Sequence, residues 1–239
     1  TTDFVKIVEG EMVMSCPVSR PDIMAAEDML GPNLGSLEGK TVRRKNMHVP
    51  SLVADAPCHV IKTHEDVTLF FDLMFVNKMC FLVAVSRNMR FGTTERMASR
   101  HAIIVGKALV TVVKFCRECG FHVKECHGDG EFGPLRGALA DAQAHLNVTA
   151  ENEHVPEVER CIRTVKERTR CDHNAVPFRR TPGMMIVELV HASNCWLNMF
   201  PENDGVSAVQ SPRRVMTGQQ VDCMLHCQLE FGECAQVHE

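Results

Sequence analysis

The sequence has 239 residues, 45% of them hydrophobic and 23% charged, with a net charge of −4. These values exclude a disordered chain, a collagen and a coiled coil, and the negative charge argues against a general nucleic-acid coat. No apolar run reaches the roughly 18 residues that a membrane span needs, and no secretory signal is visible. Twelve Cys without such a signal indicate a reduced compartment. Because the chain lacks an initiator Met, we expect it to be a piece of a longer protein.

The first 62 residues are predicted to form an arm or linker. Five prolines interrupt a weak periodicity in this segment, and proline cannot continue a helix or a sheet ladder. One short helix is expected near residues 22–30.

The pattern changes at Asp66. Residues 67–76 carry bulky apolar side chains on both faces, which is typical of a strand buried on both sides. Asn77 and Lys78 supply a turn, and residues 80–86 form the second strand of a predicted hairpin. Residues 91–94 are expected to be a short third strand.

The longest predicted helix covers residues 95–119, where apolar side chains recur at helical spacing and Gly120 follows as a C-terminal cap. Together with the hairpin, the later elements indicate an α/β fold with a mixed central sheet. These elements are strands at 121–126 and 146–149, and helices at 135–144, 156–170 and 181–201.

Two aspartates stand out in this arrangement. Asp72 shares its strand face with Phe70 and Met74, where a carboxylate is costly unless a cation or another partner compensates it. Asp129 follows a predicted strand and lies between two glycines, which allow close approach to the backbone, and Glu131 is a further carboxylate nearby. The alternatives are an Asp paired with an Arg or a backbone amide, and an ordinary Gly-Asp-Gly turn.

The helix that Pro156 opens has a charged face opposite an apolar stripe. From residue 156 to residue 180 there are seven Lys or Arg and four Asp or Glu, so this segment is +3 and the rest of the chain is −7. The alternatives are an amphipathic helix with one Glu–Arg pair and a face that binds phosphates. The face consists of Glu159, Arg163, Lys166 and Arg170, and the stripe of Val158, Ile162 and Val165.

Two strand aspartates and one helical glutamate can converge on divalent metal. Such oxygen ligands suit Mg²⁺ or Mn²⁺. Two ions about 4 Å apart can activate a water or a 3′-hydroxyl and stabilise the leaving oxygen in phosphodiester chemistry.

Over residues 40–239 the sequence resembles the integrase region of copia-type LTR retrotransposon polyproteins, and especially the protist and diatom versions. The resemblance lies in several segments that occur in the same order. These segments are FFDLMFVNKM, VSRNMRFGTTE, GDGEFGPLRGALAD, EHVPEVERCIRTVKERTR, ELVHASNCWLNMFP and SPRRVMTGQQVD.

The resemblance implies a ribonuclease H-like fold and a catalytic metal site. Asp72, Asp129 and Glu159 match the three acids of the family, which hold two Mg²⁺ or Mn²⁺ ions without an organic cofactor. The implied activity is DNA 3′-end processing and strand transfer on double-stranded DNA, the element ends and the target. The active form would be a homo-oligomer that does not associate with a membrane. It would act in a cytoplasmic particle and in the nucleus. DNA contacts are expected at Arg163, Lys166 and Arg170.

The implied domains are an N-terminal arm or linker at residues 1–62, the integrase core at 63–205, and a C-terminal extension at 206–239 toward the next polyprotein region. The sequence departs from the family where Val155-Pro156-Glu157 replaces the usual Asn-Gly before the final motif. Glu157 is therefore an alternative third acid. The zinc module of the family is not readable in residues 1–62. Two alternative functions remain, a degenerate non-catalytic remnant that folds or binds nucleic acid, and a nuclease without strand joining.

Two Cys/His clusters resemble zinc ligands only superficially. The first falls partly on the apolar stripe of the long helix, so we expect core packing there. The second has tolerable spacing without other finger features, so zinc binding stays open for it. We also expect Trp196 to be a core residue. The clusters are Cys116, Cys119, His122 and Cys126, and Cys223, Cys227, Cys234 and His238.

Overall fold

The computed structural model describes most of the chain, including all the predicted strands and helices after residue 65. The described residues are 2–10, 13–31, 33, 65–148, 155–178, 180–201, 205–207, 210–219 and 221–233.

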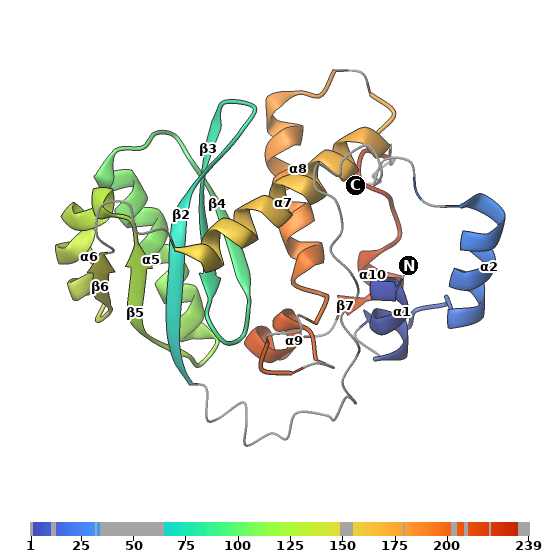
Figure 1. Cartoon of the computed structure of the whole chain (residues 1–239), viewed down its shortest axis with the longest axis horizontal. Coiled ribbons are helices and arrows are strands. Elements are labelled where there is room, and N and C mark those ends of the chain that lie inside the picture. Colours follow the sequence, from blue (N-terminus) through green and yellow to red (C-terminus); the bar gives the residue numbers. More distant parts are fainter. Residues whose placement is uncertain are drawn as a thin grey trace, which may run out of the picture.

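A five-stranded mixed sheet forms the centre of the molecule (Figure 1), with the strand order β4-β3-β2-β5-β6. The first three strands along the chain are antiparallel neighbours, whereas β5 and β6 run parallel to β2. This order and these directions are those of the ribonuclease H-like fold that the resemblance implies. The strands are β2 (Asp66–Val76), β3 (Met79–Ser86), β4 (Gly92–Met97), β5 (His122–Gly128) and β6 (His145–Val148).

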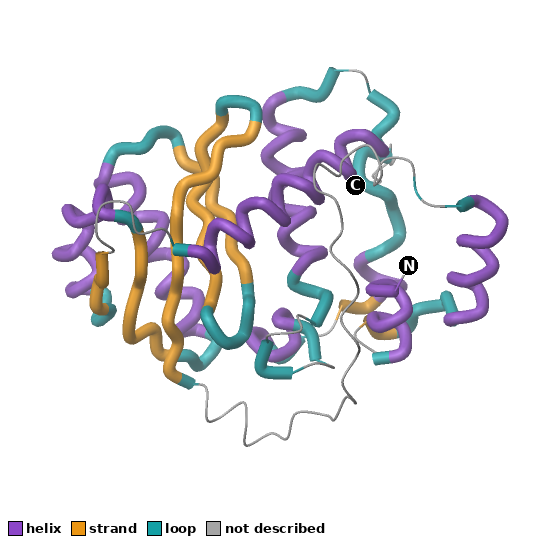
Figure 2. The backbone as a smooth tube through the Cα atoms, in the orientation of Figure 1, coloured by secondary structure: helices purple, strands orange, loops and turns teal. Residues whose placement is uncertain are grey.

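Helices cover both faces of this sheet. One side carries α5 (Ala102–Glu118), the 3₁₀ helix η1 (Gly130–Leu135) and α6 (Arg136–Asp141), and the other carries α7 (Pro156–Ala175) and α8 (Gly183–Leu197) (Figures 1 and 2). Successive β2 side chains enter the two cores alternately, because strand side chains alternate in direction. Phe71 packs into the α5 core, whereas Phe70 and Met74 pack against α7 and α8. The predicted burial of this strand on both faces is confirmed.

The boundary between the third strand and the long helix differs from the prediction. Residues 95–97, expected to begin the helix, belong to β4, where Arg96 pairs with Phe81 and Met97 with Cys80. The helix α5 begins only at Ala102. Its predicted end is confirmed, because Gly120 follows the helix with a φ of +89°, a conformation that glycine adopts without strain.

Two buried asparagines hold the edge strand β4 against α8. Asn198 accepts a hydrogen bond from the Gly92 amide at 2.8 Å, and both Asn198 and Asn194 donate to the Gly92 carbonyl, at 2.8 and 2.9 Å. A Cβ at position 92 would lie 2.9 Å from the Asn194 side-chain oxygen. These amides satisfy backbone groups that an edge strand would otherwise leave unpaired.

Described segments from the N-terminal and C-terminal parts of the chain pack together beside α8. Parallel pairing of Val13 with Val221 joins β1 to β7, and Ile7 packs with Met199 at the end of α8. The predicted helix near residues 22–30 is present, whereas α1 and β1 were not predicted. These elements are α1 (Thr2–Glu9), β1 (Val13–Met14), α2 (Arg20–Leu30), α9 (Pro212–Thr217), β7 (Val221–Asp222) and α10 (Cys223–His226).

The burial of individual side chains contradicts the prediction for Trp196 and confirms the predicted core packing in the first Cys/His cluster. Trp196, expected in the core, keeps 37% of its surface exposed on α8. Cys116 lies in the α5 core and Cys119 is partly buried against it, as expected from the apolar stripe. Cys126 of β5 lies in the same core, and burial raises the pKa of the Cys116 and Cys126 thiols to about 12. His122 is exposed, and no three side chains of the first Cys/His cluster, all of them described, are arranged to hold a metal. Among the described helices, none combines the length and apolarity that crossing a bilayer requires.

Candidate metal site where β2 and β5 separate

The parallel register of β2 and β5 sets Asp72 level with Asp129. The two strands pair from Asp66 with His122 to Phe70 with His127, and each aspartate comes two residues after the last pair. Side chains two residues apart on a strand point to the same face. The Phe70 and His127 rings on that face lie with centroids 5.2 Å apart. Asp72 and Asp129 therefore occupy the next level of the same face, at the end where the strands separate.

Asp72 carries the clearest electrostatic signature of this region. Burial raises the pKa of its carboxyl, and the negative charges of nearby acids raise it further, to about 6. The acids that act on it are Asp129, Glu131 and Glu159. The Leu73 amide donates to Asp72 Oδ1 at 2.6 Å and opposes the shift. Like charges disfavour joint ionisation and contribute to the raised pKa of Asp72, but desolvation is the larger cause.

Glu159 reaches this region from the first turn of α7. Val158 and Val165 anchor the helix in the core that contains Phe70 and Met74, and Ile162 is partly buried against it, so the predicted apolar stripe is confirmed. Acids in a first turn are favoured by the helix dipole. Glu159 is one of the acids that raise the pKa of Asp72, whereas Glu157 is not among them. The electrostatics thus favour Glu159 over the alternative third acid.

Packing, rather than ligand binding, explains why a glycine precedes Asp129. A Cβ on Gly128 would lie 2.6 Å from the Phe71 ring and 3.0 Å from that of Phe132. These two rings pack with centroids 4.9 Å apart and are almost fully buried. Gly128 therefore fixes the path of the chain into Asp129, which precedes η1 but makes no side-chain cap for it.

A fourth acid and a cation at this end of the sheet were not part of the predicted site. Glu131 acts on Asp72 and accepts an ion pair from Arg100 at 3.3 Å. Arg100 also lies 5.7 Å from the centre of the Phe75 ring. The link between β4 and α5 supplies Arg100, and the polar residues around it gave no periodic signal in the sequence.

The donor chemistry of these acids fits Mg²⁺ or Mn²⁺, because both ions prefer carboxylate oxygens. A divalent cation would also relieve the repulsion that raises the pKa of Asp72. Within the described part of the chain, however, no three His, Cys, Asp or Glu side chains are arranged to hold a metal as they stand. The acids share one neighbourhood without forming a closed coordination shell.

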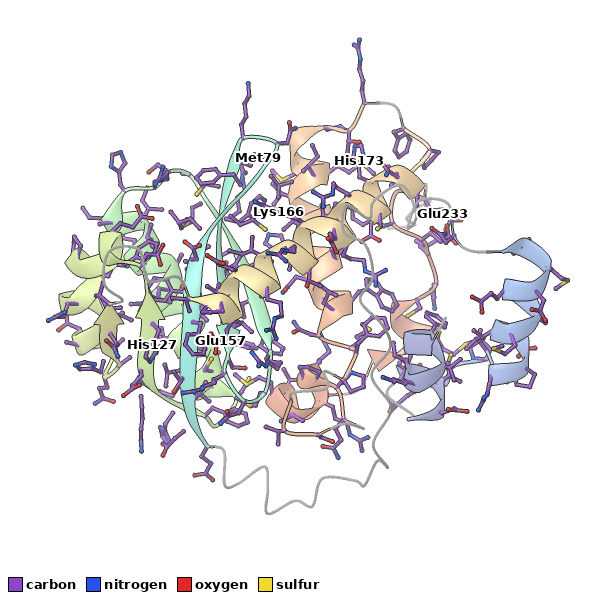
Figure 3. The ribbon with its side chains drawn as sticks, in the orientation of Figure 1. Met79, His127, Glu157, Lys166, His173 and Glu233 are labelled. Atoms are coloured by element: carbon purple, nitrogen blue, oxygen red, sulfur yellow. The ribbon has the colours of Figure 1, made fainter. Side chains whose placement is uncertain are left out.

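The predicted phosphate-binding face of α7 extends away from the acids. Arg163 and Arg170 are exposed and Lys166 is partly exposed, and Lys166 is labelled on α7 in Figure 3. Among the ion pairs between described residues, none involves Arg163 or Lys166.

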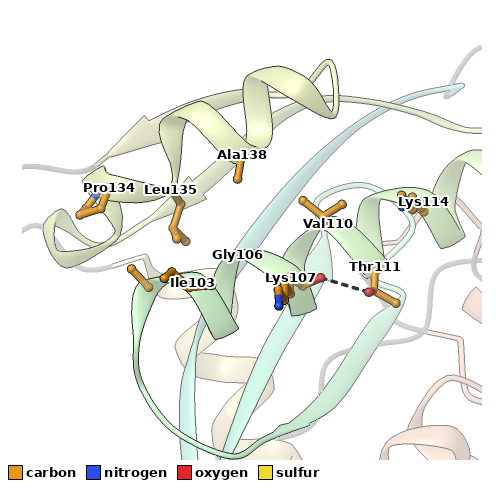
Figure 4. Close-up of a pocket in the computed structure, with 10 residues that line it drawn as sticks. Ile103, Gly106, Lys107, Val110, Thr111, Lys114, Pro134, Leu135 and Ala138 are labelled. Carbon is orange, nitrogen blue, oxygen red and sulfur yellow. Dashed lines mark hydrogen bonds between the residues drawn. The ribbon is translucent and has the colours of Figure 1, made fainter.

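A separate cavity lies on the other side of the sheet, between α5 and the segment η1–α6 (Figure 4). It measures about 610 Å³, and its wall is mainly apolar, with Ile103 at 75% exposure and Lys107 and Lys114 on α5. Thr111 donates to the Lys107 carbonyl along this wall at 3.0 Å. Because α5 covers the face opposite Asp72, this cavity is separate from the acids.

The second Cys/His cluster is only partly described, because Cys234 and His238 lie outside the described residues. The structure adds Cys16 to it, since the β1–β7 pairing brings the N-terminal and C-terminal segments together. Burial, with hydrogen bonds to the thiols of Cys227 and Cys16, raises the pKa of Cys223 to about 11. Nothing in these contacts tests zinc binding.

No protein-family model matches the chain, and no curated protein is similar to it in sequence. Among solved structures, the catalytic core domain of BIV integrase is similar at 14% identity and a TM-score of 0.47. The similarity covers 62% of this chain and 92% of that domain. The fold assignment rests on the strand order and directions described above, and we draw no functional conclusion from this similarity.

Proposed function

We propose that the chain is the core of a retrotransposon integrase, a polynucleotidyl transferase that depends on divalent metal. The observation that carries this proposal is the group of three acids, Asp129, Glu131 and Glu159, around Asp72 where β2 and β5 separate. A cluster of mutually repelling carboxylates at the end of a sheet costs stability, and a functional site is the usual reason to retain one.

In this proposal Asp72, Asp129 and Glu159 would hold two Mg²⁺ or Mn²⁺ ions. Bound ions would activate the attacking oxygen and stabilise the leaving one. In 3′-end processing, a water attacks a phosphorus near the DNA end, and the phosphodiester bond breaks to leave a free 3′-hydroxyl. In strand transfer, that hydroxyl attacks a target phosphorus and displaces the target 3′-oxygen.

The cations of α7 would hold the DNA beside these acids. Arg163, Lys166 and Arg170 follow Glu159 at four, seven and eleven residues, within about 30° of one line along the helix. Phosphates are the anions that such a row of cations favours. The DNA would comprise the element ends and the target, and the active form would be a homo-oligomer that works in the cytoplasmic particle and the nucleus. We keep residues 1–62, 63–205 and 206–239 as the proposed arm, core and extension.

The second candidate is a non-catalytic remnant that folds or binds nucleic acid. Two observations favour it, the Val155-Pro156 departure before the third acid and the lack of a ready-made coordination shell among the described residues. Both candidates keep the fold and differ only in chemistry.

Labelled double-stranded oligonucleotides in Mg²⁺ or Mn²⁺ separate the candidates. An integrase core yields both a shortened strand and longer joined products. A nuclease without strand joining yields only shortened strands. A chain that binds the oligonucleotide without changing its length is the remnant, and that result would overturn the catalytic proposal.

A further inference from the structure

A second cavity lies between α7, α8 and the end of the β2–β3 hairpin, and its polar wall is cationic. It measures about 430 Å³. Nitrogen-bearing side chains and hydroxyls supply most of its polar groups, and none of its lining residues is acidic. The lining side chains that matter here are Lys166, Arg170, His173, Thr169 and Thr181.

Thr169 is the most informative of these residues. It is only 4% exposed, and its hydroxyl has no hydrogen-bond partner among the described residues. A Thr inside a helix ordinarily donates to the carbonyl four residues earlier, as Thr164 does to Arg160 at 3.0 Å. Thr169 does not make this hydrogen bond within the helix. A buried donor without a partner is costly, and Thr169 is one of the residues that line the cavity, so an anion bound there would supply the missing acceptor.

The other polar groups converge on the same space from two elements. Thr181, which precedes α8, lies with its hydroxyl 3.2 Å from His173 Nε2 near the end of α7. Lys166 and His173 lie about two turns apart along α7, and both are labelled on that helix in Figure 3. A ligand held here meets two cations, an imidazole and two hydroxyls.

We infer that this cavity binds the phosphate group of a nucleotide, either free or within a DNA strand. Its donors and cations match an anion with several acceptor oxygens. Its volume exceeds that of a phosphate alone and falls in the range of small-molecule sites. The remaining wall is largely apolar and suits the sugar and base, with contributions from Phe75, Val76, Ile186 and Leu189.

The inference shares Lys166 and Arg170 with the proposed DNA contacts but does not rest on the acidic site. His173 follows Glu159 by fourteen residues, which is about 21 Å along the helix axis. Binding in this cavity therefore needs neither the acids nor a metal. A failure of strand transfer would leave the inference standing, and loss of nucleotide binding would leave the acidic site untouched.

Calorimetric titration of the 239-residue chain in EDTA at low salt tests this site. The probes are deoxyadenosine 5′-monophosphate, a deoxyadenosine dinucleoside monophosphate and unphosphorylated deoxyadenosine. We expect the phosphorylated probes to bind and deoxyadenosine not to bind. Preference for the 5′-monophosphate would indicate a free nucleotide or a strand end, and preference for the dinucleoside would indicate a phosphodiester inside a strand.

The decisive variants lie on one helix. Thr169→Val keeps the side-chain shape and removes the orphan hydroxyl, so binding should weaken about tenfold while the melting temperature is maintained or rises. Thr164→Val is the matched control, because its hydroxyl is already satisfied outside the cavity, and it should bind like the wild type. His173→Ala changes an exposed residue and should also weaken binding. Equal binding of deoxyadenosine, no binding of any phosphorylated probe, or unchanged binding by Thr169→Val would overturn the inference.

Discussion

The two ends of α7 have opposite chemistry. The first turn brings Glu159 to a group of acids whose charges raise the pKa of Asp72, whereas the last turns bring Lys166, Arg170 and His173 to a cavity without lining acids. On the buried side of the helix, Val158 and Val165 pack in the same core as Phe70 and Met74 of β2. One helix can thus present a cation site and an anion site, because packing on one side fixes both.

This comparison also separates stability from function. The buried stripe should determine whether the helix docks, whereas both polar ends should cost stability in the absence of a ligand. Substitutions at the ends should therefore damage chemistry or binding without unfolding the protein, and substitutions in the stripe should do the reverse.

The largest effect is expected at the acidic end. Asp72→Asn or Asp129→Asn should reduce both strand shortening and joining to background, because each change removes a ligand of the proposed metal site. The thermal melts of both variants should stay cooperative. The measurement is the labelled-oligonucleotide assay, and activity in Mg²⁺ that survives either change would contradict the assignment.

The next largest effect is expected in the stripe between the two ends. Ile162→Asp places an unpaired charge against the core beneath α7 and should destabilise the fold by about 3 kcal/mol. Urea unfolding measures this difference. Arg163→Ala, one residue further on the exposed side, is the control and should change stability by less than about 0.5 kcal/mol. Similar destabilisation by both changes would mean that the helix docks differently.

A smaller effect follows from the pKa of Asp72, which burial and neighbouring acids raise to about 6, against about 3.9 in an unfolded chain. Between these values the native state retains a proton that the unfolded state has lost. The stabilising contribution is complete below about pH 4 and is lost as pH rises through about 6. Stability without metal should decline over this window.

Asp72→Asn should remove that decline and be more stable than the wild type near pH 7, by about 1 kcal/mol. Thermal melts in EDTA across the window measure the difference between the two proteins. Burial also raises the pKa of Asp172, but this acid is present in both proteins and cancels in the difference. Parallel curves for the two proteins would show that the Asp72 carboxyl is not perturbed.

The smallest effect is expected along the exposed face that joins the two ends. Arg163→Ala should weaken DNA binding similarly for all sequences and reduce the magnitude of the salt slope by about one. Fluorescence anisotropy at several salt concentrations measures this slope. Sequence-dependent losses would point to base contacts instead, and an unchanged slope would remove this face from the DNA interface.

Much of the fold followed from periodicity. The two-sided apolar pattern of residues 67–76 and the stripe of the long helix depend on burial, which the sequence displays directly. The start of α5 could not be predicted from periodicity, because residues 95–97 join β4 through their pairing with β3, a contact that the local sequence pattern does not show. Trp196 was misplaced because an apolar residue type does not reveal which side of α8 faces solvent.

The candidate site was only partly predictable for the same reason. Asp72, Asp129 and Glu159 stood out by residue type and context, and the register sets the two aspartates level. Glu131 was noticed only as a neighbour, and Arg100 depends on a loop without periodicity. The orphan hydroxyl of Thr169 could not be predicted at all, since it requires knowing which donors and acceptors surround a buried atom.

Manganese binding tests the central claim most directly, because it asks whether the acids at the end of the sheet form a metal site. Calorimetric titration of the wild-type chain with Mn²⁺ should show saturable binding that Asp72→Asn and Asp129→Asn both abolish and that Glu159→Gln weakens. Glu157→Gln, at the alternative acid in the same turn of α7, should bind like the wild type. Wild-type binding that is unaffected by Asp72→Asn and Asp129→Asn, or no binding at all, would contradict the account.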